Sequence, residues 1–371
     1  MSPIRCVGIV GGGQLAVMMT EAAHRLGLGV EALARCADDP IFRILPNARV
    51  GDARCEEDLQ WLADRTDVLT FDHELIDHRV LARLEADGVL SRPGSCALSI
   101  AVNKQLQADL FTALGLRQPD TIVVGDVSAA LSAIRAFDDA AVLKTATGGY
   151  DGRGVLLDVS ESVVRQWFRS EVGTVLVQRR EAIADELAVQ VVRGADGIVA
   201  GYAPVRTVQS DGMCSYVSVP GEFDDSLERT AITIASQIAT AIDVVGLLTV
   251  EFFVVDGELM VNELAARPHN SGHLTIEATR TSQFENHMRA VAGLPLGSTA
   301  MVVPAAAMAN VIGGLTPAAR GALFGDEVAV HLYGKRSRPG RKIGHVTAVA
   351  DSPQEAIVRA VRAANELQTT V

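Results

Sequence analysis

Polar side chains that could do chemistry are concentrated in the stretch VNELAARPHNSGH, residues 261–273. The stretch holds acids, amides, an arginine and two histidines, and it follows the apolar run LLTVEFFVVDGELMV. A single histidine is more often structural than catalytic, but His269 and His273 lie among groups that could act with them. So many polar groups at the end of an apolar strand need a chemical explanation.

A hairpin explains part of this pattern. The pair Asp256-Gly257 predicts a tight turn between the strands LLTVEFFVVD and ELMVNEL. In that register Glu251 and Glu263 can face the same side, with Asn262 next to them. Two carboxylates and an amide oxygen form a site that Mg²⁺ prefers, completed by phosphate oxygens and water. The alternative is a pair of surface carboxylates, but the apolar neighbours on both faces indicate that the pair is buried. A buried carboxylate pair without a cation is costly, which favours a metal site.

A glycine-rich loop, KTATGGYDGRGV at residues 144–155, is the second candidate site. Its glycines let backbone N–H groups approach phosphate oxygens closely. Lys144 adds a point charge, and the forked guanidinium of Arg153 can bind an anion. No GK[ST] follows, so this is not a Walker A motif, and a flexible hairpin turn fits the composition equally well.

The segment GGGQLA, residues 11–16, resembles the first turn of a dinucleotide-binding unit. Glu31 lies about twenty residues further on, where that fingerprint places an acid. This pattern favours an NAD-dependent oxidoreductase. It is weak alone, because any strand, glycine turn and helix can bind an anion at the helix N-terminus.

A basic cluster stands out in the segment GKRSRPGRKIGH, residues 334–345. Charge runs are usually solvated loops. This one runs against the negative charge of the chain and carries a Pro-Gly turn, so a phosphate-bearing substrate is a reasonable alternative.

The elements that must position these groups change in kind along the chain. Strands over 5–10, 30–35 and 67–74 alternate with helices, which predicts a parallel α/β domain over about the first hundred residues. A helix over 100–116 follows, and then an α+β unit with antiparallel strands around the glycine-rich loop. A helix over 225–244 is expected to bury Ile234, Ile238, Ala241 and Ile242. Short strands and a final helix from Ser352 complete the pattern.

Composition limits the class of protein. With 371 residues and 48% hydrophobic residues, two or three globular domains are expected. The net charge of −12 gives no counterion-release advantage on nucleic acid, so DNA, RNA and anionic membranes are not expected partners. Five widely spaced cysteines without a CxxC predict reduced thiols in a cytoplasmic protein. No signal peptide or membrane span is indicated.

Five segments together resemble the N5-carboxyaminoimidazole ribonucleotide synthetase family of the ATP-grasp superfamily. They are ELMVNELAARPHNSGHLTIEATRTSQFENHMRAVAGLPLG, KTATGGYDGRGV, GGGQL, DVLTFDHE and KRSRPGRKIGH. The resemblance covers nearly the whole chain in the same order. It implies an N-terminal Rossmann-like domain at 1–104, a small lid domain at 105–187, and a larger α+β domain with a C-terminal extension at 188–371. It also implies a homodimer, with ATP bound between the lid and the last domain.

The activity that the resemblance implies is ATP-dependent carboxylation of 5-aminoimidazole ribonucleotide by bicarbonate, through carboxyphosphate, in purine biosynthesis. Glu251 and Glu263 are the implied Mg²⁺ ligands. The implied catalytic residues are Arg267, His269, Asn270, Lys335, Arg341 and Asp151. Those implied to bind ATP are Lys104, Lys144, Gly149, Tyr150, Asp151, Gly152, Arg153, Gly154, Gln178, Glu181, Glu186, Gln209, Asn262 and Glu263. Substrate contacts are implied for Gln14, Glu74, Tyr150, Arg153, Lys335 and Arg341.

Three departures from the family pattern keep alternatives open. Gln178, followed by Arg179 and Arg180, stands where the family usually has an acid beside adenine. Leu75 follows FDHE, where a second histidine is frequent, and SVPGEF at 218–223 replaces a Pro-Ala-Pro. A non-catalytic ATP-binding relative is therefore a third hypothesis, beside the carboxylase and the NAD-dependent enzyme. The formate-using glycinamide ribonucleotide transformylase shares the architecture, but the HNSGH block and short chain speak against it.

Overall fold

The structure is a computed structural model that describes residues 3–148, 154–170, 173–210, 212–316 and 328–369. Its first unit is a parallel sheet in the order β3-β2-β1-β4, which confirms the predicted α/β fold. The strands are β1 (Cys6–Val10), β2 (Gly29–Ala34), β3 (Arg49–Val50) and β4 (Val68–Phe71). The helices are α1 (Gln14–Arg25), η1 (Pro40–Arg43), α2 (Glu56–Ala63) and α3 (His78–Ala86).

The helix predicted over 100–116 is only partly confirmed, because two helices occupy this region. They are α4 (Ser95–Ala101) and α5 (Lys104–Ala113). Asn103 between them adopts extended backbone angles, and its side chain accepts hydrogen bonds from the N–H groups of Gln105 and Leu106. This side chain satisfies N–H groups at the start of α5, so a new helix begins there.

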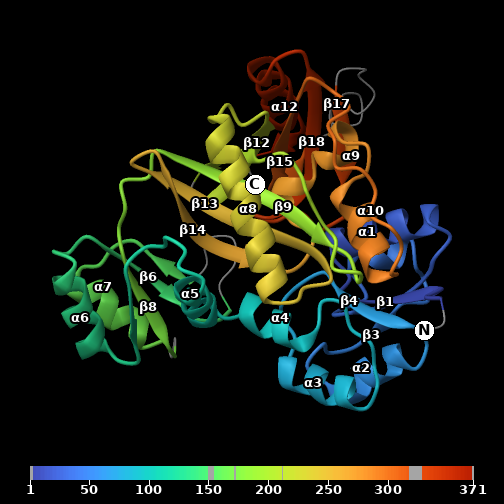
Figure 1. Cartoon of the computed structure of the whole chain (residues 1–371), viewed down its shortest axis with the longest axis horizontal. Coiled ribbons are helices and arrows are strands. Elements are labelled where there is room, and N and C mark those ends of the chain that lie inside the picture. Colours follow the sequence, from blue (N-terminus) through green and yellow to red (C-terminus); the bar gives the residue numbers. More distant parts are fainter. Residues whose placement is uncertain (1–2, 149–153, 171–172, 211, 317–327, 370–371) are drawn as a thin grey trace.

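A second, smaller sheet has the order β5-β8-β6-β7, with antiparallel pairs throughout. It lies apart from the parallel sheet (Figure 1, green). Its strands are β5 (Thr121–Val124), β6 (Ala141–Thr145), β7 (Val155–Leu156) and β8 (Val175–Arg179). The helices α6 (Val127–Ala136) and α7 (Glu161–Phe168) share its core. The Asp126 side chain accepts from the Ala129 N–H at the start of α6.

The largest sheet has nine strands, in the order β14-β13-β9-β11-β12-β15-β18-β17 with β10 paired to β9. The strands are β9 (Asp185–Arg193), β10 (Val199–Gly201), β11 (Val205–Ser210), β12 (Met213–Val219), β13 (Gly246–Val255), β14 (Glu258–Ala265), β15 (Ala305–Ile312), β17 (Val328–Leu332) and β18 (Lys342–Ala350). β16 (Gly314–Leu315) pairs separately with β19 (Gln368–Thr369). The predicted hairpin is confirmed, because Glu251 is the register partner of Glu263.

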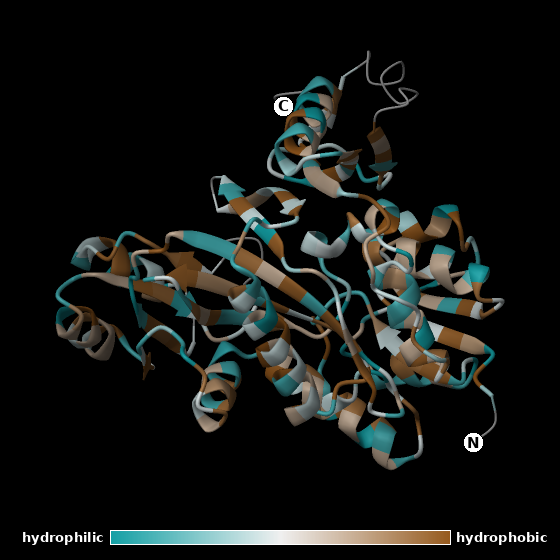
Figure 2. Ribbon diagram, turned by 45° about the horizontal axis from the view of Figure 1, so that its top comes forward, coloured by the Kyte–Doolittle hydropathy of each residue, from teal (hydrophilic) through white to brown (hydrophobic). Residues whose placement is uncertain are grey.

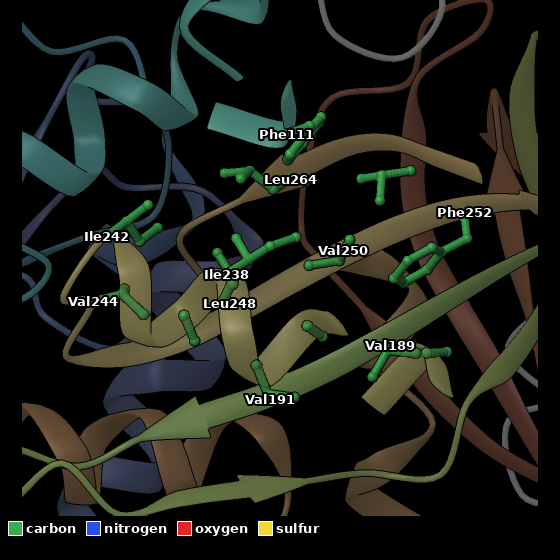
Figure 3. Packing of buried hydrophobic residues seen from close by; sticks show 14 of the residues in the cluster. Phe111, Val189, Val191, Ile238, Ile242, Val244, Leu248, Val250, Phe252 and Leu264 are labelled. Atoms are coloured by element: carbon green, nitrogen blue, oxygen red, sulfur yellow. The ribbon is translucent and has the colours of Figure 1, made fainter. Parts of the chain in front are cut away.

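Helix α8 (Asp225–Ala241) packs its buried face on β9 and β13. Figure 3 shows Ile238 of α8 close to Leu248 of β13 within this core. The predicted face is partly wrong, since Ala241 is exposed and Ile234 is only half-buried. The buried positions are Ala231, Ala235, Ile238 and Ala239, with Ile242 just beyond the helix. Ala241 follows the buried Ala239 by two positions, which turns it to the opposite side of the helix.

Further helices of the described residues pack around the large sheet. They are α9 (Thr275–Ala278), α10 (Gln283–Val291) and α12 (Pro353–Leu367), with the short η2 (Asn270–Gly272) before α9. Phe284 and Met288 of α10 share a core with Met19 of α1, so α10 joins the large sheet to the first unit. In Figure 2 the helices alternate between hydrophobic and hydrophilic segments, as expected for helices with one packed face. Within the described ranges, no helix is long and apolar enough to cross a membrane.

Candidate active site

The predicted acids and lysines of the two motifs meet at one place. Lys104 Nζ forms an ion pair with Glu263, and Lys144 Nζ donates to Asn262 Oδ1 at 2.9 Å. These four side chains come from α5, β6 and β14, and Glu251 lies opposite Glu263 on β13. The structure therefore brings together residues that are 159 positions apart in the sequence.

Helix α5 is fixed where it can supply Lys104. One turn further along, Gln107 is 3% exposed and its amide clamps the backbone of Leu264, the residue after Glu263. The Lys104 N–H donates to the carbonyl of Ala146 at 2.8 Å, just after β6. Because Lys104 and Gln107 lie on the same face of the helix, the clamp directs the ammonium to the carboxylate.

The charges of this site are unevenly distributed. Burial, followed by repulsion from Glu263, raises the pKa of Glu251. Burial also opposes ionisation of Glu263, but Lys104 and Lys144 outweigh it and lower the pKa of that carboxyl. Burial, with Lys104 nearby, lowers the pKa of Lys144 to about 8. An additional cation close to Glu251 would favour ionisation of both carboxylates.

The arginine and the histidine of the loop after β14 each contact an acid. Arg267 Nε lies 2.8 Å from Glu74 Oε1, which links this loop to the first unit. His269 Nε2 lies 3.5 Å from Glu251 Oε1, and its Nδ1 lies 2.8 Å from Ser271 Oγ. His269 therefore lies beside the carboxylate pair, whereas the acid that Arg267 contacts is Glu74 of the first unit.

Two buried amides hold this loop, and sequence analysis did not single them out. Gln283 Oε1 accepts from the His269 N–H at 2.9 Å, and Gln283 Nε2 donates to the His269 carbonyl at 2.8 Å. Gln190 Nε2 donates to Ser271 Oγ at 2.8 Å. Both glutamines are fully buried. The signal available for Gln190 was a lone amide inside the apolar strand ELAVQVVR.

The basic segment lies against the glycine turn of the first unit. Lys335 Nζ donates to Gln14 Oε1, and this ammonium lies 5.4 Å from the ring centre of Tyr333. Arg341 Nη1 donates to the carbonyl of Arg336 at 3.3 Å. Two parts of the predicted substrate site, 321 positions apart, are thus in direct contact.

The glycine turn does not support the dinucleotide hypothesis. The Gly13 N–H, at the start of α1, donates to Asp72 Oδ2 at 2.7 Å. A Cβ on Gly11 would lie 1.6 Å from Asp72 Oδ1, and Gly11 has φ +129. A buried carboxylate of this chain therefore takes the position at which a dinucleotide fingerprint binds pyrophosphate.

The residues predicted to contact the nucleoside part of ATP lie on two sheets. Glu186 Oε2 accepts from Gln209 Nε2 at 3.2 Å, and Glu186 contributes to the field on Lys144. Gln178 is 6% exposed, and its Nε2 donates to Thr121 Oγ1 at 3.1 Å. Glu181 follows β8 and is partly exposed. Gly154 accepts through its carbonyl from Thr145, while Gly149, Tyr150, Asp151, Gly152 and Arg153 lie outside the described residues.

Three family matches follow one another along the chain. Residues 4–102 match the ribonucleotide synthetase preATP-grasp domain, and residues 109–284 match the ATP-grasp domain. Residues 306–359 match the phosphoribosylaminoimidazole carboxylase C-terminal domain.

Whole-chain relatives agree with these matches. The chain is 40% identical to an N5-carboxyaminoimidazole ribonucleotide synthase of Mycobacterium tuberculosis (strain ATCC 25618 / H37Rv), over 97% of this chain and 87% of the relative. It is 32% identical to the Bacillus subtilis (strain 168) synthase, over 95% and 93%. A solved synthase from Aspergillus clavatus, in complex with ADP and 5-aminoimidazole ribonucleotide, superposes with a TM-score of 0.89 at 30% identity, covering 98% of this chain and 100% of that one.

Proposed function

The chain belongs to the family of N5-carboxyaminoimidazole ribonucleotide synthases, and from this membership we propose how its site works. The reaction is ATP-dependent carboxylation of 5-aminoimidazole ribonucleotide in purine biosynthesis. The observation that carries the assignment of residues is the meeting of Lys104, Lys144, Asn262 and Glu263 next to His269. Cations, an amide and carboxylates in one place are the groups that phosphoryl transfer requires.

In the first step, a bicarbonate oxygen attacks the γ-phosphorus of ATP, and the bond to the bridging oxygen breaks. Carboxyphosphate and ADP result. Lys104 and Lys144 bind the phosphates, and Arg267, His269 and Asn270 surround bicarbonate. Their charges and N–H groups stabilise the negative charge on the transferring phosphoryl group, which needs positioning and electrostatic stabilisation more than covalent help.

In the second step, carboxyphosphate releases carbon dioxide and phosphate, and the exocyclic amine of the ribonucleotide attacks the carbon. A nitrogen–carbon bond forms, and the amine loses a proton. Lys335 and Arg341 bind the ribonucleotide phosphate, while Gln14 and Glu74 contact its ribose and base. The contacts between Lys335 and Gln14, and between Arg267 and Glu74, support this placement because they join the two halves of the substrate site.

Glu251 and Glu263 fit Mg²⁺. The metal usually takes one or two carboxylates, with phosphate oxygens and water completing the octahedron. Burial and then repulsion from Glu263 raise the pKa of Glu251, and a bound cation would counter both effects. No group of three or more metal-binding acids, cysteines or histidines occurs in the part of the chain that the structure describes, which suits a metal bound largely through phosphates. When bound, Mg²⁺ would supply charge that neutralises the ATP phosphates.

Three further expectations stay proposals. From family resemblance we propose the domain division 1–104, 105–187 and 188–371 and a homodimer. The five widely spaced cysteines are the argument for a cytoplasmic location. The large sheet supports the third domain, because β9 to β15, β17 and β18 lie in one continuous set of hydrogen-bonded strands.

The test is release of ADP by the purified chain with ATP and Mg²⁺, measured with and without 5-aminoimidazole ribonucleotide and bicarbonate. Release that requires both supports the carboxylase. ATP binding without release under any combination would favour the non-catalytic alternative, for which the replacement of the usual acid by Gln178 is the argument. Tight binding of NADH would revive the dinucleotide hypothesis.

A further inference from the structure

The side chain of Asn310, on β15, forms a closed amide pair with Asn270. Asn270 Nδ2 donates to Asn310 Oδ1 at 2.9 Å, and Asn310 Nδ2 donates to Asn270 Oδ1 at 2.9 Å. Asn310 Nδ2 also donates to the main-chain carbonyl of Cys214 at 2.9 Å. Asn310 is only 4% exposed, so water competes little for these hydrogen bonds.

The Cys214 carbonyl decides the orientation of the pair. A carbonyl oxygen can only accept, so Asn310 must turn its Nδ2 towards Cys214. Both hydrogens of that nitrogen are then used, one for Cys214 and one for Asn270 Oδ1. The Oδ1 of Asn310 needs a donor, and Asn270 Nδ2 supplies it. Rotating either amide by half a turn would place two acceptors against each other in a buried position.

This orientation leaves the second Nδ2 hydrogen of Asn270 available to donate. Its oxygen faces Asn310, and one of its two Nδ2 hydrogens is used. Among the described residues, no other side chain or carbonyl accepts the second hydrogen. Asn270 is half-buried and next to His269, so this N–H remains for an anion in the site.

We propose that Asn310 is a positioning residue, which makes Asn270 present an N–H rather than an oxygen to bicarbonate. The inference rests on the proposed function. An unclamped Asn270 amide could turn its oxygen to an anionic oxygen, which repels it. Asn310 lies within the segment that matches the C-terminal domain, whereas Asn270 lies within the ATP-grasp match. The C-terminal segment thus controls a group in the phosphoryl-transfer site.

Two variants test this inference by steady-state ADP release with bicarbonate as the varied substrate. Asn310→Asp keeps the shape but has no donor when ionised, and Asn310→Ser removes the contact with Asn270 without burying a charge. We expect each to raise the KM for bicarbonate about tenfold or more at pH 8, the effect of losing one hydrogen bond to an anion. The KM for ATP should stay unchanged. Asn47→Asp, the same replacement at an exposed turn, is the control.

The pH dependence separates positioning from a structural role. Burial favours the protonated form of the carboxyl that Asn310→Asp introduces, and the O–H of that form then replaces the lost donor. The bicarbonate KM of Asn310→Asp, divided by that of the wild type at the same pH, should fall as the pH is lowered from 8.5 to 6.5. The ratio for Asn310→Ser should stay constant. Thermal midpoints show whether each variant is folded, and Asn310→Ser decides the matter if Asn310→Asp does not fold.

The outcomes are distinct. If the wild type needs bicarbonate for ADP release and folded Asn310→Ser keeps the wild-type bicarbonate KM, the inference is wrong and the proposed function stands. If the wild type shows no bicarbonate-dependent release, both fall together.

Discussion

Replacing Glu263 by Gln should raise the Mg²⁺ concentration that gives half-maximal ADP release. Gln has nearly the same shape and still accepts a hydrogen bond from Lys104, so the change is mainly one of charge. Glu263 and Glu251 are register partners on β14 and β13, and both side chains are partly exposed, 36% and 26% respectively. The variant therefore leaves one carboxylate where the wild type has two.

The size of the effect follows from charge, exposure and competition. Two unit charges 4 Å apart interact by about 4 kcal/mol at an effective dielectric of 20. Since more than a third of the Glu263 side chain is exposed, solvent screening reduces this to about 2 kcal/mol. Lys104 already occupies the carboxylate, and displacing it removes up to about 1 kcal/mol more. The remaining 1–2 kcal/mol corresponds to roughly a 5- to 30-fold higher Mg²⁺ requirement.

The assay is an Mg²⁺ titration of ADP release at fixed, saturating ATP, bicarbonate and ribonucleotide. Glu258→Gln is the matched control, because Glu258 lies on the same strand, pairs with Arg117 and has a side chain that is 75% exposed. A Glu263→Gln protein with the same Mg²⁺ dependence as Glu258→Gln and the wild type would refute the assignment of this carboxylate to the metal.

Three other predictions concern charge and backbone. The kcat/KM for ATP should fall above pH about 8, where Lys144 loses its proton in the enzyme without bound ATP. Lys144→Arg stays charged, so it should abolish that fall in a pH–rate profile. If the fall persists in this variant, Lys144 is not its cause. Burial lowers the pKa of His273, His287 and His345, so the unfolded chain binds more protons below its histidine pKa near 6.5. The contribution of these histidines to stability is therefore complete above pH about 6.5 and is lost as the pH falls, by at most about 1.4 kcal/mol per histidine per pH unit. Urea unfolding at pH 7.5 and 5.5 measures this loss, and equal stabilities at the two pH values would contradict it. Gly11→Ala should lower the free energy of unfolding by at least about 2 kcal/mol more than Gly27→Ala does. Both glycines have positive φ, but only at Gly11 would a Cβ clash with Asp72. Thermal unfolding compares the two variants, and equal losses of stability would contradict the clash.

Local sequence signals predicted the elements whose conformation is determined by residues adjacent in the sequence. The hairpin of β13 and β14 was predictable because Asp256 and Gly257 both adopt positive φ, which Asp-Gly pairs favour. The parallel sheet was predictable because buried strands and amphipathic helices alternate there. The break before α5 was missed, because the cap made by Asn103 is a single residue within an otherwise helical pattern.

Strands that depend on their neighbours could not be predicted in the same way. β15 reads AAAMANVI, and alanine favours helix over strand. It forms a strand because β12 and β18 pair with it on both sides, and their positions depend on residues far away in sequence. β11 and β12 are rich in polar residues, and they too are held by pairing with each other and with β9 and β15.

The site itself shows where sequence reasoning ends. The motif that contains Glu263 was visible because its residues are adjacent, and family resemblance suggested roles for Lys104 and Lys335. The Lys104–Glu263 ion pair, the Lys335–Gln14 hydrogen bond and the Asn270–Asn310 amide pair each join segments at least 40 positions apart. Spacing cannot predict such contacts, because each depends on how two sheets and the helices between them pack. Asn310 is the clearest case, since a lone amide in an alanine-rich run acquires a chemical meaning only when Asn270 and the Cys214 carbonyl are placed beside it.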